Sequence, residues 1–97
     1  MARLDFHPAA VCELEASTDW YFERSPRAGQ GFANAIEFAL EDIEKNPDRF
    51  PKIDTRHRSC NVQKYPFQII FRESKDTIHV VAVAHSKRRP GYWKKRR

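Results

Sequence analysis

The spacing of apolar residues changes once along the chain, and this change constrains the fold more than any other feature of the sequence. Up to about residue 46 the apolar side chains recur every three or four residues, which is the period of an amphipathic helix. From Arg58 onward they alternate with polar neighbours or form short apolar runs, which is typical of β-strands. Because helical and strand-like segments are segregated along the chain, the sequence predicts an α+β fold.

Two helices are expected in the first half of the chain. The first runs from about Pro8 to Phe22, and its apolar stripe consists of Val11, Leu14, Thr18 and Tyr21. The segment ERSPRAGQG holds one proline and two glycines and is expected to form a turn. The second helix then carries an apolar face and ends before Pro47, because the residue that precedes a proline avoids the helical conformation. That face consists of Phe32, Ile36, Leu40 and Ile43.

Four strands are expected. A short one precedes the first helix, where Leu4 and Phe6 alternate with polar residues. A second begins at Arg58 and alternates as far as Lys64, and the segments FQIIFRE and TIHVVAVAH form the last two, after the turns YPF and SKD. Such short connections predict an antiparallel meander. The last strand is apolar on both faces from Val80 to Ala84, which predicts a central, buried position in the sheet.

The order of elements predicts a two-layer α+β domain: an N-terminal strand, a helical hairpin and a three-stranded antiparallel meander. Both helices would cover the same face of the sheet and leave the opposite face free. A chain of 97 residues buries roughly 65% of the surface that its unfolded form exposes, which is enough for one modest core. We therefore expect one domain spanning residues 1–97.

The sequence also bears on the cellular compartment. The N-terminus MARLDFHPAA lacks the charged start and long apolar stretch of a signal peptide, and no apolar run approaches the roughly 20 residues of a spanning helix. The expected location is the cytoplasm. Cys12 and Cys60 are expected to remain reduced there, and Cys12 is expected to pack beside the apolar stripe of the first helix rather than act as a nucleophile.

The charge of the chain is concentrated at its C-terminal end. Residues 85–97 hold seven Lys and Arg and no acid, a formal charge of +7, whereas eleven bases and thirteen acids in residues 1–84 give −2. A positive field at one end favours an anionic partner, either nucleic acid or an acidic protein segment.

Other bases fall on the expected strands. Adjacent strands lie about 4.8 Å apart, so bases on the uncovered face can cluster and bind phosphates or a carboxylate-rich peptide. Protection of the sheet edges explains Lys64 and Arg72 equally well. The candidates for contact with a target or a protein partner are Arg56, Arg58, Lys64, Arg72, Lys87, Arg88, Arg89, Trp93 and Arg96.

The two aromatic residues of the basic end have two alternative roles. Tyr92 and Trp93 can stack on unpaired nucleic-acid bases, or fold back and pack on the sheet. Packing is favoured for Trp93, because an exposed tryptophan is unfavourable and its size makes it a good anchor. The role of Tyr92 stays open at this point.

Most catalytic and metal-binding motifs are absent from the sequence. It contains no HExxH, CxxC or G-x-S-x-G motif and no glycine-rich phosphate loop. The four histidines, His7, His57, His79 and His85, show no metal-ligand spacing. We therefore expect neither a metal nor a cofactor.

Several short motifs, taken in order, resemble the ParE/RelE superfamily of toxins from type II toxin–antitoxin modules, also described as plasmid stabilisation proteins. The similarity covers nearly the whole chain. The motifs are F-x-P-A at Phe6 to Ala9, WY at Trp20 and Tyr21, F at Phe32, NPDRFP at Asn46 to Pro51, YPFQIIF at Tyr65 to Phe71, and H-x-x-R-x-P-x-Y-W from His85 to Trp93. The resemblance implies a bacterial or archaeal host, a helical hairpin on an antiparallel sheet, and a partner antitoxin whose disordered, acidic or amphipathic segment wraps the toxin.

The resemblance implies two alternative targets. RelE-like members cut mRNA on the ribosome, and His85, Arg88 and Tyr92 would then be catalytic, with Arg56 and Arg58 stabilising charge on the phosphate. ParE-like members poison DNA gyrase without catalysis, and the terminus RRPGYW resembles this branch, in which His85 and Arg88 are structural. We expect a toxin that acts on gyrase, ahead of mRNA cleavage; a nucleic-acid-binding module without toxicity is a third alternative.

Overall fold

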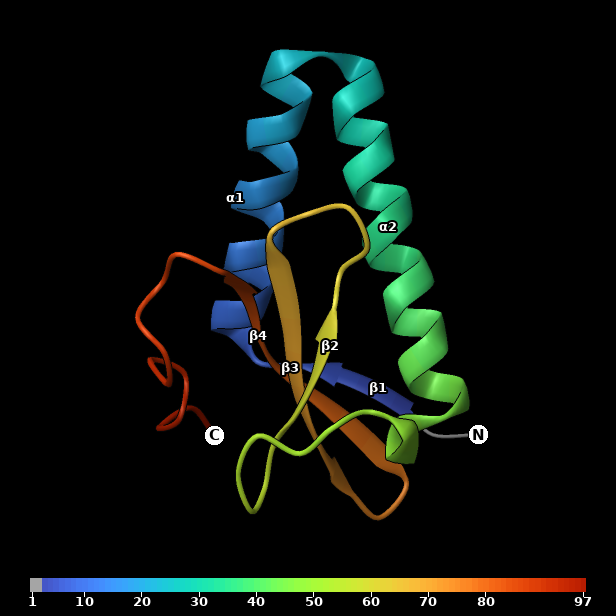
Figure 1. Cartoon of the computed structure of the whole chain (residues 1–97), viewed down its shortest axis with the longest axis vertical. Helices are drawn as coiled ribbons and strands as arrows, with labels where there is room; N and C mark the ends of the chain where they lie inside the picture. Colours follow the sequence, from blue (N-terminus) through green and yellow to red (C-terminus); the bar gives the residue numbers. More distant parts are fainter. Residues whose placement is uncertain (1–2) are drawn as a thin grey trace.

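The computed structural model describes residues 3–97, and their order of elements is the expected one (Figure 1). Strand β1 (Arg3–Phe6) leads into helices α1 (Pro8–Arg24) and α2 (Pro26–Lys45), and a 3-10 turn η1 (Pro47–Arg49) follows. Strands β2 (Arg58–Asn61), β3 (Phe67–Ser74) and β4 (Thr77–His85) complete the sheet. The strand order is β1-β4-β3-β2, with β1 parallel to β4 and the other pairs antiparallel. The predicted α+β class, the antiparallel meander and the central position of the last strand are confirmed.

Helix α1 begins where the sequence predicts it, but its buried face is different. Pro8 occupies the first turn, and the Nδ1 atom of His7 accepts a hydrogen bond from the Ala9 N–H at 3.0 Å, which caps the helix. Ala10 is fully buried, and Leu14 and Tyr21 pack against the core. Val11 is 37% exposed, so its expected place on the buried stripe is wrong.

The segment expected to be a turn between the helices is mostly helical. Ser25 alone separates α1 from α2, and residues 26–31 form the first turns of α2. The Oγ atom of Ser25 accepts a hydrogen bond from the Ala28 N–H at 2.9 Å, and Pro26 follows at the first helical position, where its missing N–H costs nothing. Gly29 is buried against the ring of Phe22, and a Cβ atom there would overlap that ring. The glycine therefore marks a close approach of the two helices rather than a loop.

The core lies between the helical hairpin and one face of the sheet. Helix α2 contributes Phe32, Ile36, Ala39 and Ile43, all buried, so its predicted face is confirmed apart from Leu40, which is only partly buried. An irregularity in the pairing of β3 with β4, at Ile70 and Phe71, leaves Val81 as an extra residue in β4. The bulge changes the phase of β4: Val80 and Val83 both join the core under the helices, and Val81 joins a second cluster. His85 consequently lies on the same side of the sheet as α1.

Strand β2 is shorter than predicted. It ends at Asn61, and the chain turns there because the Val62 N–H bonds to the Phe67 carbonyl at 2.9 Å. Lys64, expected at the end of this strand, lies in the turn with a φ of 71°.

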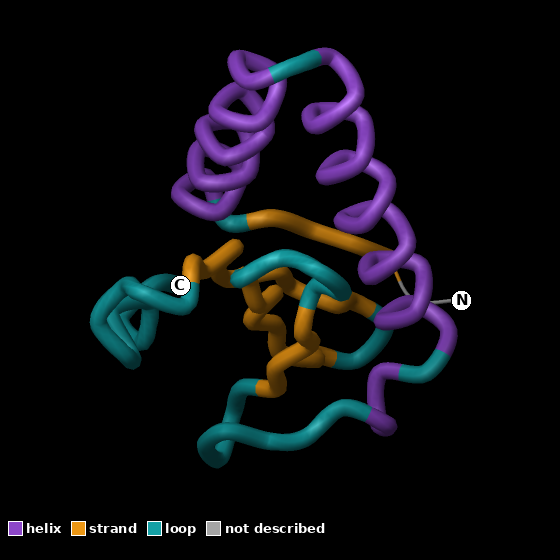
Figure 2. The backbone as a smooth tube through the Cα atoms, turned by 45° about the horizontal axis from the view of Figure 1, so that its top comes forward, coloured by secondary structure: helices purple, strands orange, loops and turns teal. Residues whose placement is uncertain are grey.

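The face of the sheet opposite the helices is not free, contrary to expectation. Residues 86–97, here called the tail, fold back as a compact coil (Figure 2). Trp93 packs on that face with Ile70, Val81, Ala82 and Ala84, and it retains 6% of its exposure. The Trp93 ring and this strand face are both apolar, and leaving either in contact with water is unfavourable. Packing one against the other buries both surfaces, which explains why the tail docks.

Two further expectations concern the cysteines and the membrane. Cys12 and Cys60 are both free thiols, as predicted. Cys12 is exposed, so its expected packing is wrong, whereas Cys60 is buried and burial raises the pKa of its thiol to about 11. Within residues 3–97, neither helix is long and apolar enough to cross a membrane.

Candidate functional site

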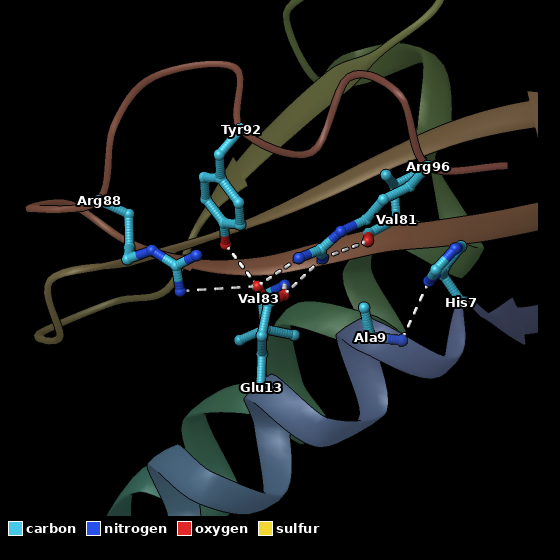
Figure 3. A network of polar contacts seen from close by, with 8 residues as sticks. All are labelled: His7, Ala9, Glu13, Val81, Val83, Arg88, Tyr92 and Arg96. Atoms are coloured by element: carbon cyan, nitrogen blue, oxygen red, sulfur yellow. Dashed lines mark hydrogen bonds and ion pairs between the residues drawn. The ribbon is translucent and has the colours of Figure 1, made fainter.

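The carboxylate of Glu13 joins helix α1 to the last strand and the tail (Figure 3). It accepts hydrogen bonds from the Val83 N–H at 3.0 Å, from the Tyr92 hydroxyl at 2.7 Å, and from both terminal nitrogens of Arg96 at 2.9 Å. Nη1 of Arg96 also donates to the Val81 carbonyl at 3.1 Å. The Glu13 and Arg96 side chains are only 13% and 17% exposed. This arrangement fixes the tail against α1 and β4.

The network sets the charge state of its members. Burial raises the pKa of the Glu13 carboxyl, but the hydrogen bonds from Arg96, Tyr92 and Val83 outweigh it, so the pKa lies below its ordinary value. Burial, the bond to Glu13 and the charge of that carboxylate together raise the pKa of Tyr92 to about 12. The Tyr92 hydroxyl is therefore a protonated donor at neutral pH, and its proton is already committed to Glu13.

Arg88 is the exposed cation beside this network. Its guanidinium lies 4.0 Å from the centre of the Tyr92 ring and 4.0 Å from a Glu13 oxygen. Its side chain remains 54% exposed, so the charge is held in place and still accessible to a partner.

His85 fixes the turn that starts the tail. Its Nδ1 atom accepts a hydrogen bond from the Lys87 N–H at 3.0 Å, and its carbonyl accepts one from the Arg88 N–H at 3.0 Å. Its ring packs edge-on against Phe67, with 4.9 Å between the ring centres. Because Nδ1 accepts the backbone bond, the neutral ring carries its proton on Nε2. In the neutral ring, Nδ1 is therefore the acceptor and Nε2 carries the proton.

An apolar groove of about 470 Å³ runs beside His85 along α1. Its walls are Ala16, Ser17, Trp20, Tyr21, Pro66, Phe67 and His85. Trp20 is 49% exposed, and the Arg24 guanidinium lies 3.4 Å from the centre of its ring. The groove adjoins a smaller cavity of about 280 Å³, to which Glu13, Val83 and Arg88 contribute, so apolar and cationic surfaces are continuous at this end of the sheet.

The remaining candidate residues lie at different places. Arg58 donates to the Phe50 carbonyl at 2.7 Å and lies 3.4 Å from Glu73, so it holds the loop before β2. Arg56 and Arg72 line a separate polar cleft at the other end of the sheet. Lys87 and Arg89 are exposed on the tail, and Lys64 is exposed in the turn before β3. The structure thus gathers Arg88, Tyr92 and Arg96 around Glu13 and places His85 beside Arg88 at the adjoining small cavity. Arg56, Arg58 and Arg72 lie apart from them.

Trp93 has the packing role rather than the contact role. Its ring centre lies 4.7 Å from that of His57, which is itself buried and hydrogen-bonded to Asp54 at 3.0 Å. A side chain so buried offers no surface to a partner in this structure. Packing on the sheet, the alternative favoured for Trp93 from the sequence, is what the structure shows, and its contact with a partner stays a prediction.

Sequence reasoning missed Glu13 and the apolar groove. Glu13 falls outside the apolar stripe of Val11, Leu14, Thr18 and Tyr21, at a position where an acid usually faces water. A tail with seven bases and no acid implies a counter-charge elsewhere, but thirteen acids are available and the sequence does not select one. Among residues 3–97, no group of three or more His, Cys, Asp or Glu side chains is arranged to hold a metal ion.

The fold and the basic tail packed on its sheet define a small two-layer α+β protein. A solved structure described as the chromosomal ParDE TA system from P. aeruginosa superposes with a TM-score of 0.76 at 18% identity, covering 90% of this chain and 98% of that chain. The family described as the ParE toxin of type II toxin–antitoxin system, parDE, matches residues 4–90. The chain belongs to this family of ParE toxins. Comparison with curated proteins gives no match.

Proposed function

We propose that this ParE-family toxin arrests growth by acting on DNA gyrase as a non-catalytic inhibitor, and that a cognate antitoxin neutralises it. Residues 1–97 act together as one toxin domain, and the site of action is the cytoplasm, where gyrase is found.

The state of the candidate catalytic groups carries the proposal. Cleavage of RNA needs a base for the 2′-hydroxyl and an acid for the leaving oxygen, both free to exchange protons near neutral pH. Tyr92 has a pKa of about 12 and donates to Glu13, and His85 uses Nδ1 to accept the Lys87 N–H. Both terminal nitrogens of Arg96 donate hydrogen bonds to the Glu13 carboxylate. These contacts are those of a structural latch, which favours inhibition through binding over catalysis.

The antitoxin is proposed to bind the apolar groove beside α1 and the adjacent basic tail. An amphipathic, acidic segment would place apolar side chains on Trp20 and Phe67 and carboxylates near Arg88 and Arg89. Folding of such a segment on binding covers a large surface with few residues.

Inducible expression in a bacterium, with plasmid supercoiling and mRNA integrity as two readouts, tests the target. Wild type, His85→Gln and Tyr92→Phe proteins are compared at equal soluble amounts. For each of the three proteins that is folded, the expected result is growth arrest and disturbed supercoiling, with intact mRNA. A loss of mRNA cleavage by about a hundredfold in folded His85→Gln protein is what removal of a general acid or base produces. That result would overturn this proposal in favour of a ribonuclease.

The alternative, ribosome-dependent mRNA cleavage, rests on one observation. His85 and the exposed Arg88 line the same small cavity, which is the pairing of a proton-transfer group with a phosphate-binding cation. Fragmented mRNA with normal supercoiling on expression of the wild-type protein would decide for this alternative.

A further inference from the structure

A second cleft, polar throughout, lies at the end of β4 opposite to His85. It has a volume of about 600 Å³, and its walls are Asp5, Lys52, Thr55, Arg56, Arg58, Arg72, Glu73, Ser74 and His79. Six residues of strand, about 20 Å, separate His79 from His85. The cleft therefore lies apart from the groove and from the Glu13 network, and only the end of the tail reaches it, where the Arg97 carbonyl oxygen lies 3.2 Å from Nε2 of His79.

The cleft carries excess positive charge. Its two carboxylates already have partners, since Glu73 lies 3.4 Å from Arg58 and Asp5 lies 3.3 Å from His79. Across residues 3–97, no carboxylate lies within 4.0 Å of the charged nitrogens of Lys52, Arg56 or Arg72, the remaining cations of the wall.

The backbone holds these cations at defined places. Arg72 pairs with His79 in the register of β3 and β4, so both side chains extend from the same face, and both are half-buried. The loop that carries Lys52 and Arg56 is fixed by Asp54, whose Oδ1 atom accepts the Arg56 N–H at 2.8 Å and the His57 N–H at 2.7 Å. The Ile53 N–H donates to the His57 carbonyl at 2.9 Å, which closes the same loop. Two arginines, Arg56 from the loop and Arg72 from β3, thus line the same cleft.

We propose that this cleft binds a phosphate group, as carried by a nucleotide or by the backbone of a nucleic acid. Guanidinium forks match phosphate oxygens in bidentate geometry, and the Thr55 and Ser74 hydroxyls supply further donors. An acidic peptide is the other anion to consider, but an amphipathic segment also needs apolar contact, and none of the nine wall residues is apolar. Such contact is available at the groove beside Trp20 instead.

This inference does not rest on the proposed inhibition of gyrase. It assigns a ligand class to a cleft that neither the tail network nor the apolar groove includes. A negative result in the test below leaves the growth-arrest experiment unaffected, and the reverse also holds.

Titrations of the isotope-labelled full chain, followed by backbone amide shifts, test the site directly. The probes are inorganic phosphate, adenosine monophosphate, a twelve-nucleotide single-stranded DNA and a poly-glutamate peptide of equal length. We expect the amides of Thr55, Arg56 and Ser74 to shift with the phosphate-bearing probes. Equal affinity for the mononucleotide and the DNA identifies a nucleotide site, and tighter binding of the DNA identifies a backbone site. Poly-glutamate that binds the same amides as tightly as the DNA does would overturn the proposal in favour of an acidic peptide.

Charge-removing variants supply the control for non-specific attraction. Arg56→Gln and Arg72→Gln are compared with Arg27→Gln, an exposed base at the start of α2 and outside the cleft. Each cleft variant should weaken DNA binding by about tenfold and lower the slope of log affinity against log salt by about one, the effect of losing one phosphate contact. Lys52→Gln, on an exposed side chain, serves in place of Arg72→Gln if that variant does not fold. An equal loss in Arg27→Gln, or amide shifts confined to the tail, would rule the cleft out.

Discussion

Glu13 organises the C-terminal end of this toxin through a single carboxylate. It accepts four hydrogen bonds, one from the β4 backbone and three from side chains of the tail. A buried carboxylate is costly unless it is paired and hydrogen-bonded, and here both conditions are met. Tyr92, a candidate catalytic residue, and Arg96, a candidate contact residue, both donate hydrogen bonds to this carboxylate.

Removing the Glu13 side chain should destabilise the protein. Glu13→Ala leaves the Arg96 guanidinium and the Val83 N–H without their acceptor, and we expect the free energy of unfolding to fall by about 2–3 kcal/mol, reduced from the fully buried case because both side chains keep some exposure. Urea unfolding measures this. The matched control is Glu15→Ala, an exposed acid on the same helix. Equal effects of the two substitutions would contradict a latch at Glu13.

The pH dependence of stability should reveal the same carboxylate. The pKa of Glu13 in the folded protein is lowered from the ordinary 4.5, so its contribution to stability is fully present above about pH 4.5 and is lost as the pH falls through the folded-state pKa. Replacement by Gln removes this titration. The difference in unfolding free energy between wild type and Glu13→Gln, measured in urea, should be constant from pH 7 to about 5 and shrink toward pH 3. A difference that stays constant down to pH 3 would show that Glu13 does not titrate with folding.

At the scale of elements, the helical hairpin contains a close contact next to its connection. Gly29 in α2 faces the Phe22 ring of α1, and only Ser25 joins the two helices. A glycine within a helix costs about 1 kcal/mol relative to alanine, so its presence at this contact indicates that the missing Cβ matters more than the helix propensity.

A double-mutant cycle tests this contact. Gly29→Ala in the wild-type background should lower the unfolding free energy by about 1–3 kcal/mol through overpacking against Phe22. In a Phe22→Ala background the same change should be neutral or stabilising by up to about 1 kcal/mol, because only the helix propensity remains. Chemical denaturation of the four proteins gives the coupling. A Gly29→Ala effect that is identical in both backgrounds would exclude the steric explanation.

The tail behaves as an element of the core because of Trp93. Trp93→Ala should cost about 3–5 kcal/mol, the usual range for a buried large aromatic. Trp20, half-exposed on α1, is the matched control, and Trp20→Ala should change stability by no more than about 0.5 kcal/mol. Thermal unfolding by circular dichroism separates the two. Similar melting temperatures for the two variants would mean that the tail does not dock in solution.

At the scale of the whole molecule, the positive charge of the tail lies next to the apolar groove. The tail holds +7 and the rest of the chain −2, counting His85 as neutral, and Arg88 stands where the groove meets the tail. Binding of an antitoxin there would combine burial of apolar surface with attraction that salt screens.

The salt dependence of antitoxin binding tests this combination. Affinity for the cognate antitoxin should fall as ionic strength rises, and Arg89→Glu should weaken binding more than Arg27→Glu, a reversal of an exposed base distant in sequence from the tail. Isothermal titration calorimetry at low and at physiological salt measures both effects. Affinity that is unchanged by salt and by Arg89→Glu would assign the contact to the apolar groove alone.

Local sequence determined the elements and their class. Period and turn chemistry placed the first helix and the four strands within a few residues, because side chains three or four apart share a helix face and alternate residues share a strand face. The second helix begins earlier than predicted, at Pro26, within the segment expected to be a turn. The apolar run of Val80 to Ala84 predicted the centre of the sheet, since only a central strand is buried on both faces. Motifs spread along the whole chain pointed to the family that the match over residues 4–90 establishes.

The tertiary structure decided which residues are free to act. Gly29 looked like a turn because its contact with Phe22 lies across the hairpin, and Glu13 looked solvated because its partners lie some 70 to 83 residues away in the chain. The β4 bulge set the side to which His85 points, through one unpaired residue that no periodicity reveals. Hydrogen bonds and burial depend on approach in space, whereas sequence patterns report only neighbours along the chain, and for that reason the latch, the groove and the cationic cleft emerged only from the folded molecule.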